Sequence, residues 1–479
     1  MVKINYYKSW FALTILAIPS IALADVDRCA DASIVQIQRP LYPNSDPADS
    51  FAYRFRQTKT AQSGLPTIIV LPGGPGEGSI GDDTWLNGTA VLTASGTVTR
   101  FQRVPDGYGV IQTDPRGIGC NHLSQSLDKN EFYNTENLAA DVIAIIESQH
   151  LQNYMIYGSS YGTLLGTVIT AQLEKNKSYQ NVSKPSALVI DGVVGKAFKP
   201  GEAFEVTLTM WERFKREAPP EQIKFLSASP RPSVLVVKTP IEMVPMLGRD
   251  GKAILGRNSQ PIMVPARVLV TPSDHEFGVA FGSMLSRYFS ASSTMKESFK
   301  TLFFNLSSSD AYDKKQAQEG LGNMISGLSE SDPDQDTMQT YIGCREISSD
   351  IYPGYTFSGT ELVAMPSGLC KDVPMSRPYD SADPRWRIKS VPIYYFSGTE
   401  DAATPFKMAE YHYVNQTETK RTFVVIPGGL HESLKGLLPQ SMAGVFSAIT
   451  AEVNGAAADA LSSVVKNREL PSITIKRSY

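Results

Sequence analysis

Short runs of apolar and β-branched residues recur along this chain, and stretches with helical hydrophobic spacing lie between them. The runs are 67–71, 109–114, 154–157, 187–191, 392–396 and 422–426. Between the second and third runs, 136–149 carries Leu138, Val142, Ile145 and Ile146, which a helix would gather on one face. This alternation is typical of a mostly parallel sheet flanked by helices. We therefore expect an α/β fold in which a β-α-β unit leads into 158–162.

The alternation fails from about residue 195 to about residue 383. We predict that 25–195 and 386–479 form the core and that 196–385 is an inserted, mainly helical cap. Within the cap, 233–237 and 262–271 have extended patterns separated by glycine-containing turns, so a small β element is expected there. After the last run, 439–465 has the spacing of a helix with one buried stripe.

The N-terminus has the pattern of a secretory signal. Lys3 and Lys8 supply positive charge, 10–22 is nearly all apolar, and Ala22-Leu23-Ala24 fits a cleavage site. We predict a signal peptide at 1–24, with export to a periplasm or out of the cell. The alternative is a membrane anchor, but the apolar run is shorter than the roughly 20 residues a spanning helix needs. We expect no membrane insertion after cleavage.

Composition narrows the range of partners. The chain has 479 residues, 42% hydrophobic and 19% charged, with a formal net charge of −3. No separate Lys/Arg cluster creates a basic field for phosphates, so nucleic acid is not an expected partner. The oligomeric state is left open.

The four cysteines are interpreted in the light of export, because oxidising compartments favour disulfides. Three pairings are possible, and we favour Cys344 with Cys370, which are close in the chain, leaving Cys29 and Cys120. Zinc binding is the weaker alternative, because no pair has the short CxxC spacing. Free buried thiols also remain open.

Gly158-Ser159-Ser160-Tyr161-Gly162 follows a strand-like run and precedes a helix-like one. This context is that of a strained turn that exposes a nucleophilic serine, and the flanking glycines let strand and helix approach closely. The motif alone is common, and its alternative interpretation is a glycine-rich turn. We predict Ser160 as the nucleophile.

A serine hydroxyl needs a base to accept its proton and an acid to orient that base. His431 follows the last strand-like run, whereas His122, His150, His275 and His412 occupy less suitable positions. Asp401 follows the run at 392–396, and its neighbour Glu400 competes for the same role. The order Ser160, Asp401, His431 is that of α/β-hydrolases. The alternative for Asp401 is a turn or helix N-terminal carboxylate.

Acyl transfer also needs two backbone N–H groups that bind the oxyanion. Tyr161, directly after the serine, is predicted to supply one. Gly74, in Pro72-Gly73-Gly74-Pro75-Gly76, is predicted to supply the other, although this loop also fits a simple tight turn. Its spacing does not match a phosphate-binding loop or a dinucleotide fingerprint. No metal or cofactor is expected.

These segments resemble the exported tripeptidyl-aminopeptidases and prolyl iminopeptidases, which are serine peptidases with the α/β-hydrolase fold. The resemblance is carried by Gly73-Gly74-Pro75-Gly76, by Asp114-Pro115-Arg116-Gly117-Ile118-Gly119 and by the serine motif, with Asp401 and His431 completing it. The long insertion and Cys344 favour the tripeptidyl branch. Pro72 departs from the family, where His is frequent, and so does Gly195-Lys196, where Asp-Pro is frequent. Both departures bear on substrate preference.

The resemblance implies a cap carboxylate that pairs with the substrate's N-terminal ammonium. Glu202, Glu205, Glu212 and Glu346 are candidates, with Glu346 favoured because Cys344 is close to it. For each, the alternative is a solvated surface carboxylate. Asp114 and Arg116 are expected to form an ion pair or a turn outside the chemistry.

The sequence thus predicts an exported serine hydrolase that releases short peptides or single residues from free N-termini through an acyl-enzyme. Its partner would be a peptide substrate. Two alternatives remain: a carboxylesterase or lactonase with the same triad, because fold and triad do not determine what a cap admits, and an inactive binding module.

Overall fold

The computed structural model describes most of the chain. The described residues are 29–43, 49–87, 89–92, 98–101, 103–123, 128–199, 202–229, 231–237, 242–255, 259–274, 277–278, 281–282, 285, 304–329, 337–350, 354–366, 368–437, 442–466 and 473–478. The predicted signal peptide, 1–24, and His275 lie outside them. The described residues divide into two compact units, one within Arg28–Met210, Ser331–Pro353 and Pro366–Tyr479, the other within Trp211–Glu330 and Gly354–Met365.

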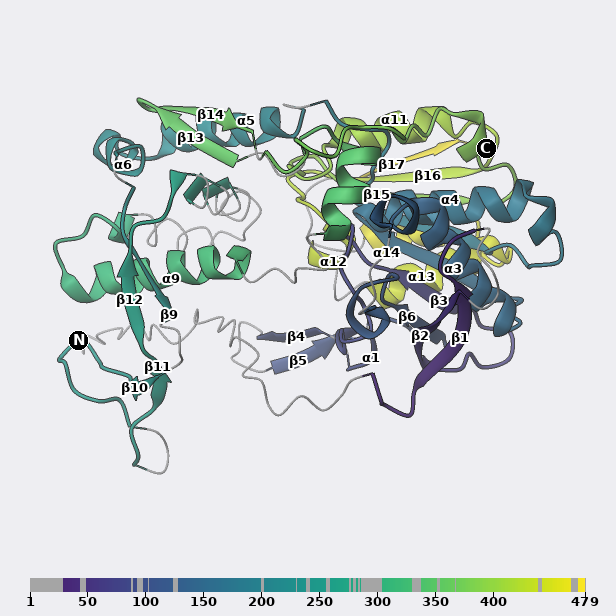
Figure 1. Cartoon of the computed structure of the whole chain (residues 1–479), viewed down its shortest axis with the longest axis horizontal. Coiled ribbons are helices and arrows are strands. Elements are labelled where there is room, and N and C mark those ends of the chain that lie inside the picture. Colours follow the sequence, from purple (N-terminus) through teal and green to yellow (C-terminus); the bar gives the residue numbers. More distant parts are fainter. Residues whose placement is uncertain are drawn as a thin grey trace, which may run out of the picture. The chain divides into compact units, whose positions relative to one another are not determined.

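The first unit, called the core unit below, is built on a nine-stranded sheet (Figure 1). Strands β6, β3, β7, β8, β15 and β16 are parallel, and β1, β2 and β17 extend the two ends of the sheet in antiparallel pairing. In sheet order the strands are β1 (Ile34–Pro40), β2 (Ser50–Lys59), β6 (Gly109–Thr113), β3 (Thr67–Leu71), β7 (Tyr154–Ser159), β8 (Ala187–Asp191), β15 (Ile393–Gly398), β16 (Arg421–Ile426) and β17 (Thr474–Ser478).

Helices cover both faces of this sheet. Successive strand residues point to opposite sides, and both sides carry apolar side chains that the helices remove from water. Ile156 and Ile190 lie in the apolar cluster formed with α3 (Thr135–Ser148) and α4 (Tyr161–Lys175). Tyr157 and Val189, each one position away, join the cluster formed with α13 (Met442–Val453) and α14 (Ala460–Lys466). The central strands are therefore buried on both faces, and the predicted α/β-hydrolase architecture is confirmed.

The remaining elements of the core unit are short. A two-stranded ribbon pairs β4 (Thr89–Leu92) with β5 (Val98–Phe101), and a π-helix spans Gln339–Ile347. The other helices are α1 (Thr84–Asn87), α2 (Lys129–Phe132), α11 (Phe406–Asn415) and α12 (Ser433–Leu437). α5 (Glu202–Glu217) is longer and belongs to both units, because Trp211–Glu217 is part of the second unit. It is an amphipathic helix with acidic residues in its first turn and basic residues in its last, which suits its dipole.

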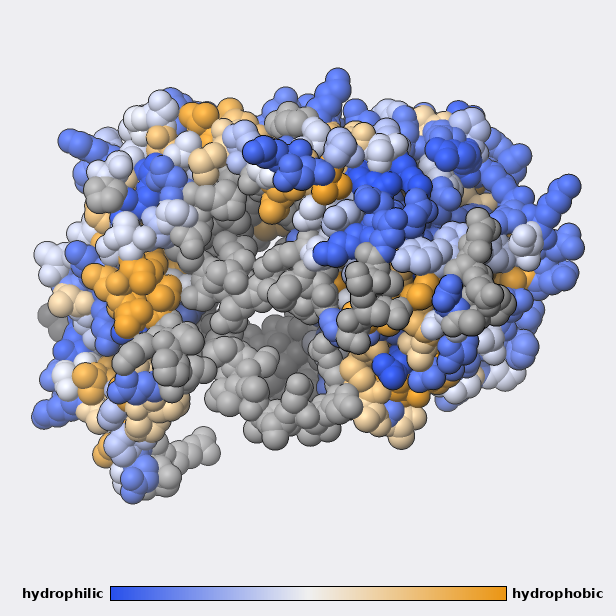
Figure 2. Space-filling model, viewed as in Figure 1, coloured by the Kyte–Doolittle hydropathy of each residue, from blue (hydrophilic) through white to orange (hydrophobic). Residues whose placement is uncertain are grey.

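The second unit combines helices with two-stranded ribbons. Its elements are α6 (Pro220–Leu226), β9 (Val234–Val237), β10 (Met243–Pro245), β11 (Met263–Pro265), β12 (Arg267–Val270), α9 (Ala311–Ser329), β13 (Gly354–Ser358) and β14 (Glu361–Met365). β9 pairs with β12 and packs on α9, and Trp211, Phe277, Phe281 and Phe357 form an aromatic cluster. Figure 2 shows apolar surface over β12, where Val268 and Leu269 are 38% and 61% exposed.

Most expected elements occur where the pattern placed them, and β3 and β8 have the predicted bounds. The continuous helix predicted at 439–465 is wrong. α13 ends at Val453 and α14 begins at Ala460, with Gly455 between them at φ +71°, a conformation that ends a helix. The domain bounds 25–195, 196–385 and 386–479 stay predictions.

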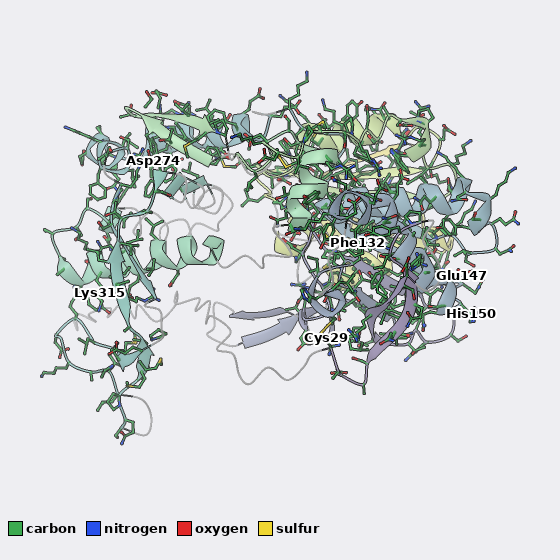
Figure 3. All side chains as sticks on the ribbon, viewed as in Figure 1. Cys29, Phe132, Glu147, His150, Asp274 and Lys315 are labelled. Carbon is green, nitrogen blue, oxygen red and sulfur yellow. A yellow bond between two sulfur atoms is a disulfide. The ribbon has the colours of Figure 1, made fainter. Side chains whose placement is uncertain are left out.

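All four cysteines form disulfides, and the favoured pairing of Cys344 with Cys370 is confirmed. Cys29 pairs with Cys120 and ties the start of the described chain to the segment after β6 (Figure 3). Two disulfides fit an oxidising compartment. Among the described residues, no helix is both long and apolar enough to cross a membrane.

Candidate active site

Ser160 lies on a sharp turn between β7 and α4. Its φ of 51° and ψ of −121° are strained for a residue with a side chain, and such strain clusters at functional sites. The turn is held by hydrogen bonds on both sides: Ser160 N–H donates to the Asp191 carbonyl at 2.9 Å, and Thr163 N–H donates to the Ser160 carbonyl at 2.9 Å. The backbone thus fixes the direction in which the serine side chain leaves the turn.

The two glycines of the motif are required by close approach. A Cβ at Gly158 would lie 2.2 Å from the Gly162 carbonyl oxygen, and a Cβ at Gly162 would lie 2.4 Å from the Leu71 carbonyl oxygen. No side chain fits at either position without moving backbone. The Gly-x-Ser-x-Gly spacing therefore follows from packing of β7, α4 and β3.

His431 and Asp401 are brought together from the ends of the next strands. Asp401 follows β15, His431 follows β16, and His431 Nδ1 lies 2.9 Å from Asp401 Oδ2. Asp401 is fully buried, and its carboxylate also accepts the backbone N–H groups of Ala403 and Thr404 and the Thr404 hydroxyl. These bonds fix the carboxylate, which then selects the tautomer with hydrogen on Nδ1 and leaves Nε2 as the acceptor in the neutral ring.

The charge of Asp401 dominates the protonation of His431. Removal of the imidazole from water lowers the pKa of His431, but the charge and hydrogen bond of Asp401 outweigh this and raise that pKa to about 9. The imidazolium is therefore the stabilised form. A base that works by becoming charged gains from such an arrangement.

Among the described residues, no hydrogen bond or ion pair joins Glu400, the competing acid, to His431. The Glu400 backbone N–H donates to the Gly429 carbonyl at 2.9 Å, whereas the hydrogen-bond partners of His431 are Asp401 and Thr404. Within the described part of the chain, the Ser160 hydroxyl makes no hydrogen bond with His431. In serine hydrolases this bond is often long until substrate binds.

The segment 73–76 lies against the serine turn. A Cβ at Gly73 would be 3.2 Å from Ser160 Cβ, and Gly74 has a φ of +104°. Tyr161 is the first residue of α4, so its N–H has no acceptor within the helix. The two predicted oxyanion donors, Gly74 and Tyr161, thus come from segments that meet at Ser160.

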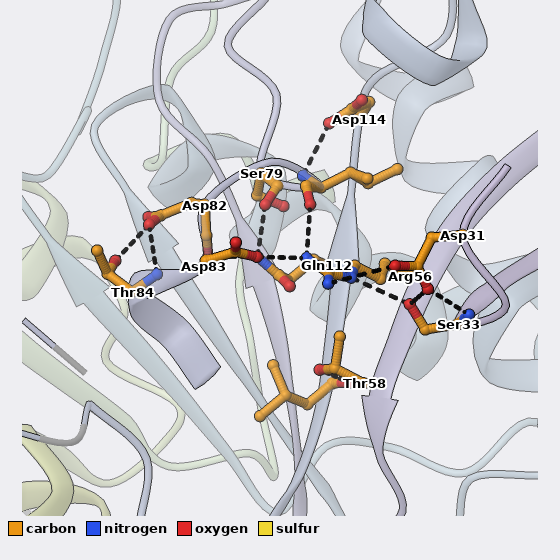
Figure 4. A network of polar contacts seen from close by, with 12 residues as sticks. Asp31, Ser33, Arg56, Thr58, Ser79, Asp82, Asp83, Thr84, Gln112 and Asp114 are labelled. Carbon is orange, nitrogen blue, oxygen red and sulfur yellow. Dashed lines mark hydrogen bonds and ion pairs between the residues drawn. The ribbon is translucent and has the colours of Figure 1, made fainter. Parts of the chain in front are cut away.

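A polar network fixes the chain just after this loop (Figure 4). Ser79 donates both its N–H and its hydroxyl to the Thr113 carbonyl at the end of β6. Gln112 donates to the Ser79 carbonyl, and the buried Asp114 carboxylate accepts the Ile80 N–H at 3.0 Å. The loop is therefore anchored to the neighbouring strand.

Two further carboxylates, which were not among the predicted site residues, lie close to Gly73. Glu77 Oε2 and Glu432 Oε1 would be 3.0 and 3.5 Å from a Cβ at Gly73, and Glu432 pairs with Lys435 at 2.9 Å. Desolvation and the charge of Glu432 raise the pKa of Glu77. In the sequence, Glu77 directly follows Gly76 and Glu432 directly follows His431, and these positions could have marked both carboxylates as neighbours of the site.

The predicted amine-binding carboxylates differ in environment. Glu346, on the π-helix, is 7% exposed and accepts hydrogen bonds from the N–H and the hydroxyl of Thr135, the first residue of α3. Thr135 Oγ1 also lies 2.8 Å from the Tyr161 hydroxyl. Burial raises the pKa of Glu346 to about 7, although the bonds from Thr135 oppose this. Glu346 thus belongs to the surroundings of Tyr161.

The other candidates are paired with lysines. Glu212, whose side chain is 47% exposed, lies in the second unit and pairs with Lys215 at 2.7 Å. Glu202 pairs with Lys196, and Glu205 with Lys407. Each of these three has a counter-charge already.

Of the two expectations for Asp114 and Arg116, an ion pair or a turn, the structure contains the turn, in which the Ile118 N–H donates to the Pro115 carbonyl at 3.1 Å, but not the ion pair. Arg116 is buried and makes a bidentate pair with Asp141 of α3, with both N–O distances 2.7 Å. Asp114 instead accepts the backbone N–H groups of Ile80 and Cys120, each at 3.0 Å. Arg116 thus pairs with a residue 25 positions away, and Asp114 accepts from residues 34 and 6 positions away.

Comparison with known proteins gives distant similarities. No family model and no curated protein match the chain. A solved proline iminopeptidase from Mycobacterium smegmatis is 13% identical, covers 88% of this chain and 100% of its own, and has a TM-score of 0.40. A thermophilic esterase from Thermogutta terrifontis is 14% identical, with coverage of 87% and 99% and a TM-score of 0.37. A meta-cleavage product hydrolase from Pseudomonas fluorescens is 13% identical, with coverage of 82% and 93% and a TM-score of 0.39.

These similarities are too distant to carry an argument about substrate. The assignment rests on the chain's own geometry, in which a parallel sheet presents a strained serine after β7 and an Asp–His pair after β15 and β16. On those connections the chain has the α/β-hydrolase fold.

Proposed function

We propose that this chain is an exported serine hydrolase of the aminopeptidase type, which releases single residues or short peptides from free N-termini. The observation that carries the proposal is the buried Asp401 bonded to His431 in the same core unit as the strained Ser160. Structural carboxylates and histidines seldom occur together with a serine forced into positive φ at a strand-to-helix turn.

In the proposed reaction, Ser160 Oγ attacks the scissile carbonyl while His431 Nε2 takes the hydroxyl proton. The resulting oxyanion is bound by the N–H groups of Tyr161 and Gly74. Collapse breaks the C–N bond, and His431 returns its proton to the leaving amine. Water then attacks the acyl-enzyme, with His431 again as base, and restores Ser160. Asp401 keeps the imidazole oriented and stabilises its charged form.

The peptide substrate is inferred from the local motifs that resemble the aminopeptidase families. For the substrate's ammonium group we propose Glu346 rather than Glu212. Each oxygen of Glu346 accepts one bond from Thr135, so lone pairs remain for another donor, and a buried carboxylate pairs strongly with a cation. Glu212 is half-exposed and neutralised by Lys215, which weakens its attraction for a second cation.

The test uses purified protein with matched pairs of peptide anilides, free or acetylated at the N-terminus. The free forms should be cleaved and the acetylated forms should not, and Glu346→Gln should raise KM for the free forms alone. Equal rates of cleavage of the free and acetylated forms would rule out recognition of the substrate's N-terminus. A strong preference for nitrophenyl esters over every peptide would make an esterase or lactonase the better account.

Labelling with a fluorophosphonate tests the serine itself. The wild-type chain should be labelled at Ser160, and Ser160→Ala should not be labelled. A wild-type chain that resists labelling would favour a binding module.

A further inference from the structure

Asp191 occupies a central position in the core unit that the proposed chemistry does not use. It is the last residue of β8, the strand between β7 and β15, and it is fully buried. Its carbonyl oxygen accepts the Ser160 N–H at 2.9 Å. The backbone of Asp191 therefore holds the nucleophile turn.

The side chain of Asp191 holds a different segment. Its Oδ1 accepts the Leu434 N–H and its Oδ2 accepts the Lys435 N–H, both at 3.1 Å. These donors belong to α12, which begins two residues after His431. Since first-turn N–H groups have no partner within their helix, the buried carboxylate satisfies both and fixes where α12 starts.

The residue after Asp191 lies against His431 itself. Gly192 has a φ of +70°, and a Cβ there would lie 3.0 Å from both Cε1 and Nδ1 of His431. The Gly192 N–H donates to the Phe396 carbonyl of β15, the strand that leads to Asp401. Within two residues the chain thus touches the serine turn, the histidine ring and the strand of the acid.

We infer that Asp191 is a positioning residue that couples the serine turn to the histidine loop, through its carbonyl on one side and its carboxylate on the other. The inference rests on the proposed function only for its catalytic consequence. Displacements near 1 Å of a catalytic group cost up to about 100-fold in rate, so loss of this link is expected to lower kcat and leave KM nearly unchanged.

Asp191→Asn keeps the size of the side chain, but its NH₂ group cannot accept the second N–H. Glu174→Gln is the matched control: the Glu174 carboxylate likewise accepts consecutive backbone N–H groups, those of Lys389, Ser390 and Val391. It lies near the far end of α4, about 20 Å from Ser160 at the helical rise per residue. Both variants lose a similar bond, but only Asp191 is joined to the site.

The first measurement is the rate of Ser160 labelling by a fluorophosphonate, with melting temperatures taken in parallel. Asp191→Asn should label about 10- to 100-fold more slowly than the wild type, and Glu174→Gln at the wild-type rate. Asp191→Asn labelling at the wild-type rate, or equal slowing in both variants, would overturn the inference while the proposed function stands.

The second measurement is NMR titration of the His431 imidazole, which needs no catalysis. Asp191→Asn should change the ring signals and lower the pKa of His431, since a nearby negative charge is lost, and Glu174→Gln should change neither. If the wild-type chain is not labelled, the proposed function fails, and this titration still decides the positioning role. If Asp191→Asn does not fold, Asp191→Ser replaces it in both measurements, and wild-type behaviour of that variant would refute the coupling.

Discussion

Replacing Asp401 with Asn tests the electrostatic core of the site. Desolvation lowers the pKa of His431, but the charge and the hydrogen bond of Asp401 outweigh desolvation and raise that pKa to about 9. The difference from the ordinary value of about 6.5 corresponds to roughly 3 kcal/mol of preference for the charged imidazole. Asn keeps the shape but removes the charge, so the pKa of His431 should fall to its ordinary value or below.

The expected result combines two opposite changes. At pH 7 more of the His431 in Asp401→Asn is neutral, yet turnover should fall by about 10⁴-fold, because the amide favours the wrong tautomer and no longer stabilises the imidazolium. In the wild type, rates should rise with pH up to about 9, since only neutral His431 accepts the serine proton.

A fluorophosphonate is the suitable probe, because it has no amino group that titrates in the same range. The second-order labelling rate is measured from pH 5 to 10 for the wild type, Asp401→Asn and the control Glu400→Gln. Glu400→Gln should keep the wild-type profile. The reasoning is refuted if the wild-type rate levels off near pH 6.5, or if Asp401→Asn keeps the wild-type midpoint.

Three further predictions concern stability and packing. Glu346 has a pKa near 7 in the folded chain against about 4.5 when unfolded, so the folded state binds more protons between these values and stability falls as pH rises from 4.5 to 7. Glu346→Gln should lose this dependence, seen as a gain of up to roughly 3 kcal/mol relative to wild type at pH 8 by denaturant titration. Replacing Cys344 and Cys370 together with Ala opens a cross-link between residues 26 positions apart and should cost about 3.5 kcal/mol on the chain-entropy account. Gly162→Ala places a methyl group 2.4 Å from the Leu71 carbonyl oxygen, so it should cost about 1–3 kcal/mol and slow Ser160 labelling.

Each of these has a clear contrary result. A Glu346→Gln stability that runs parallel to wild type across pH would mean that the pKa of Glu346 is the same in the folded and unfolded chain. An unchanged denaturation midpoint without the Cys344–Cys370 bond would mean that the link does not restrain the unfolded chain. Gly162→Ala with wild-type stability would show that β3 and α4 can separate without cost.

The features predictable from sequence were those with a local physical cause. The apolar runs that became β3 and β8 are buried on both faces, so each carries a continuous signal over its length. Ser160 could be proposed as the nucleophile because its motif depends on a strand and a helix adjacent in sequence. Asp401 and His431 could be proposed from their positions after successive strands, and the structure brings His431 Nδ1 within 2.9 Å of Asp401 Oδ2.

The features missed were those decided by strand order and long-range contact. Arg116 pairs with Asp141, 25 positions away, and not with the nearby Asp114, because α3 packs beside it. Asp191 reaches α12 across 243 positions, and nothing around Ala187–Asp191 in the sequence indicates that helix. Glu77 and Glu432 meet at Gly73 only because the loops after β3 and β16 end at the same edge of the sheet.

The sequence by itself therefore determined the class of fold and supplied the candidates for nucleophile, acid and base, since hydrophobic periodicity and turn chemistry act between near neighbours. Tertiary structure alone decided which charges face one another around Ser160, because those contacts arise when β8 lies between β7 and β15. Burial then sets the strength of these electrostatic contacts. The carboxylates of Asp191, Asp401 and Glu346 interact strongly with their hydrogen-bond partners because they are removed from water, and removal from water is a property of the whole fold.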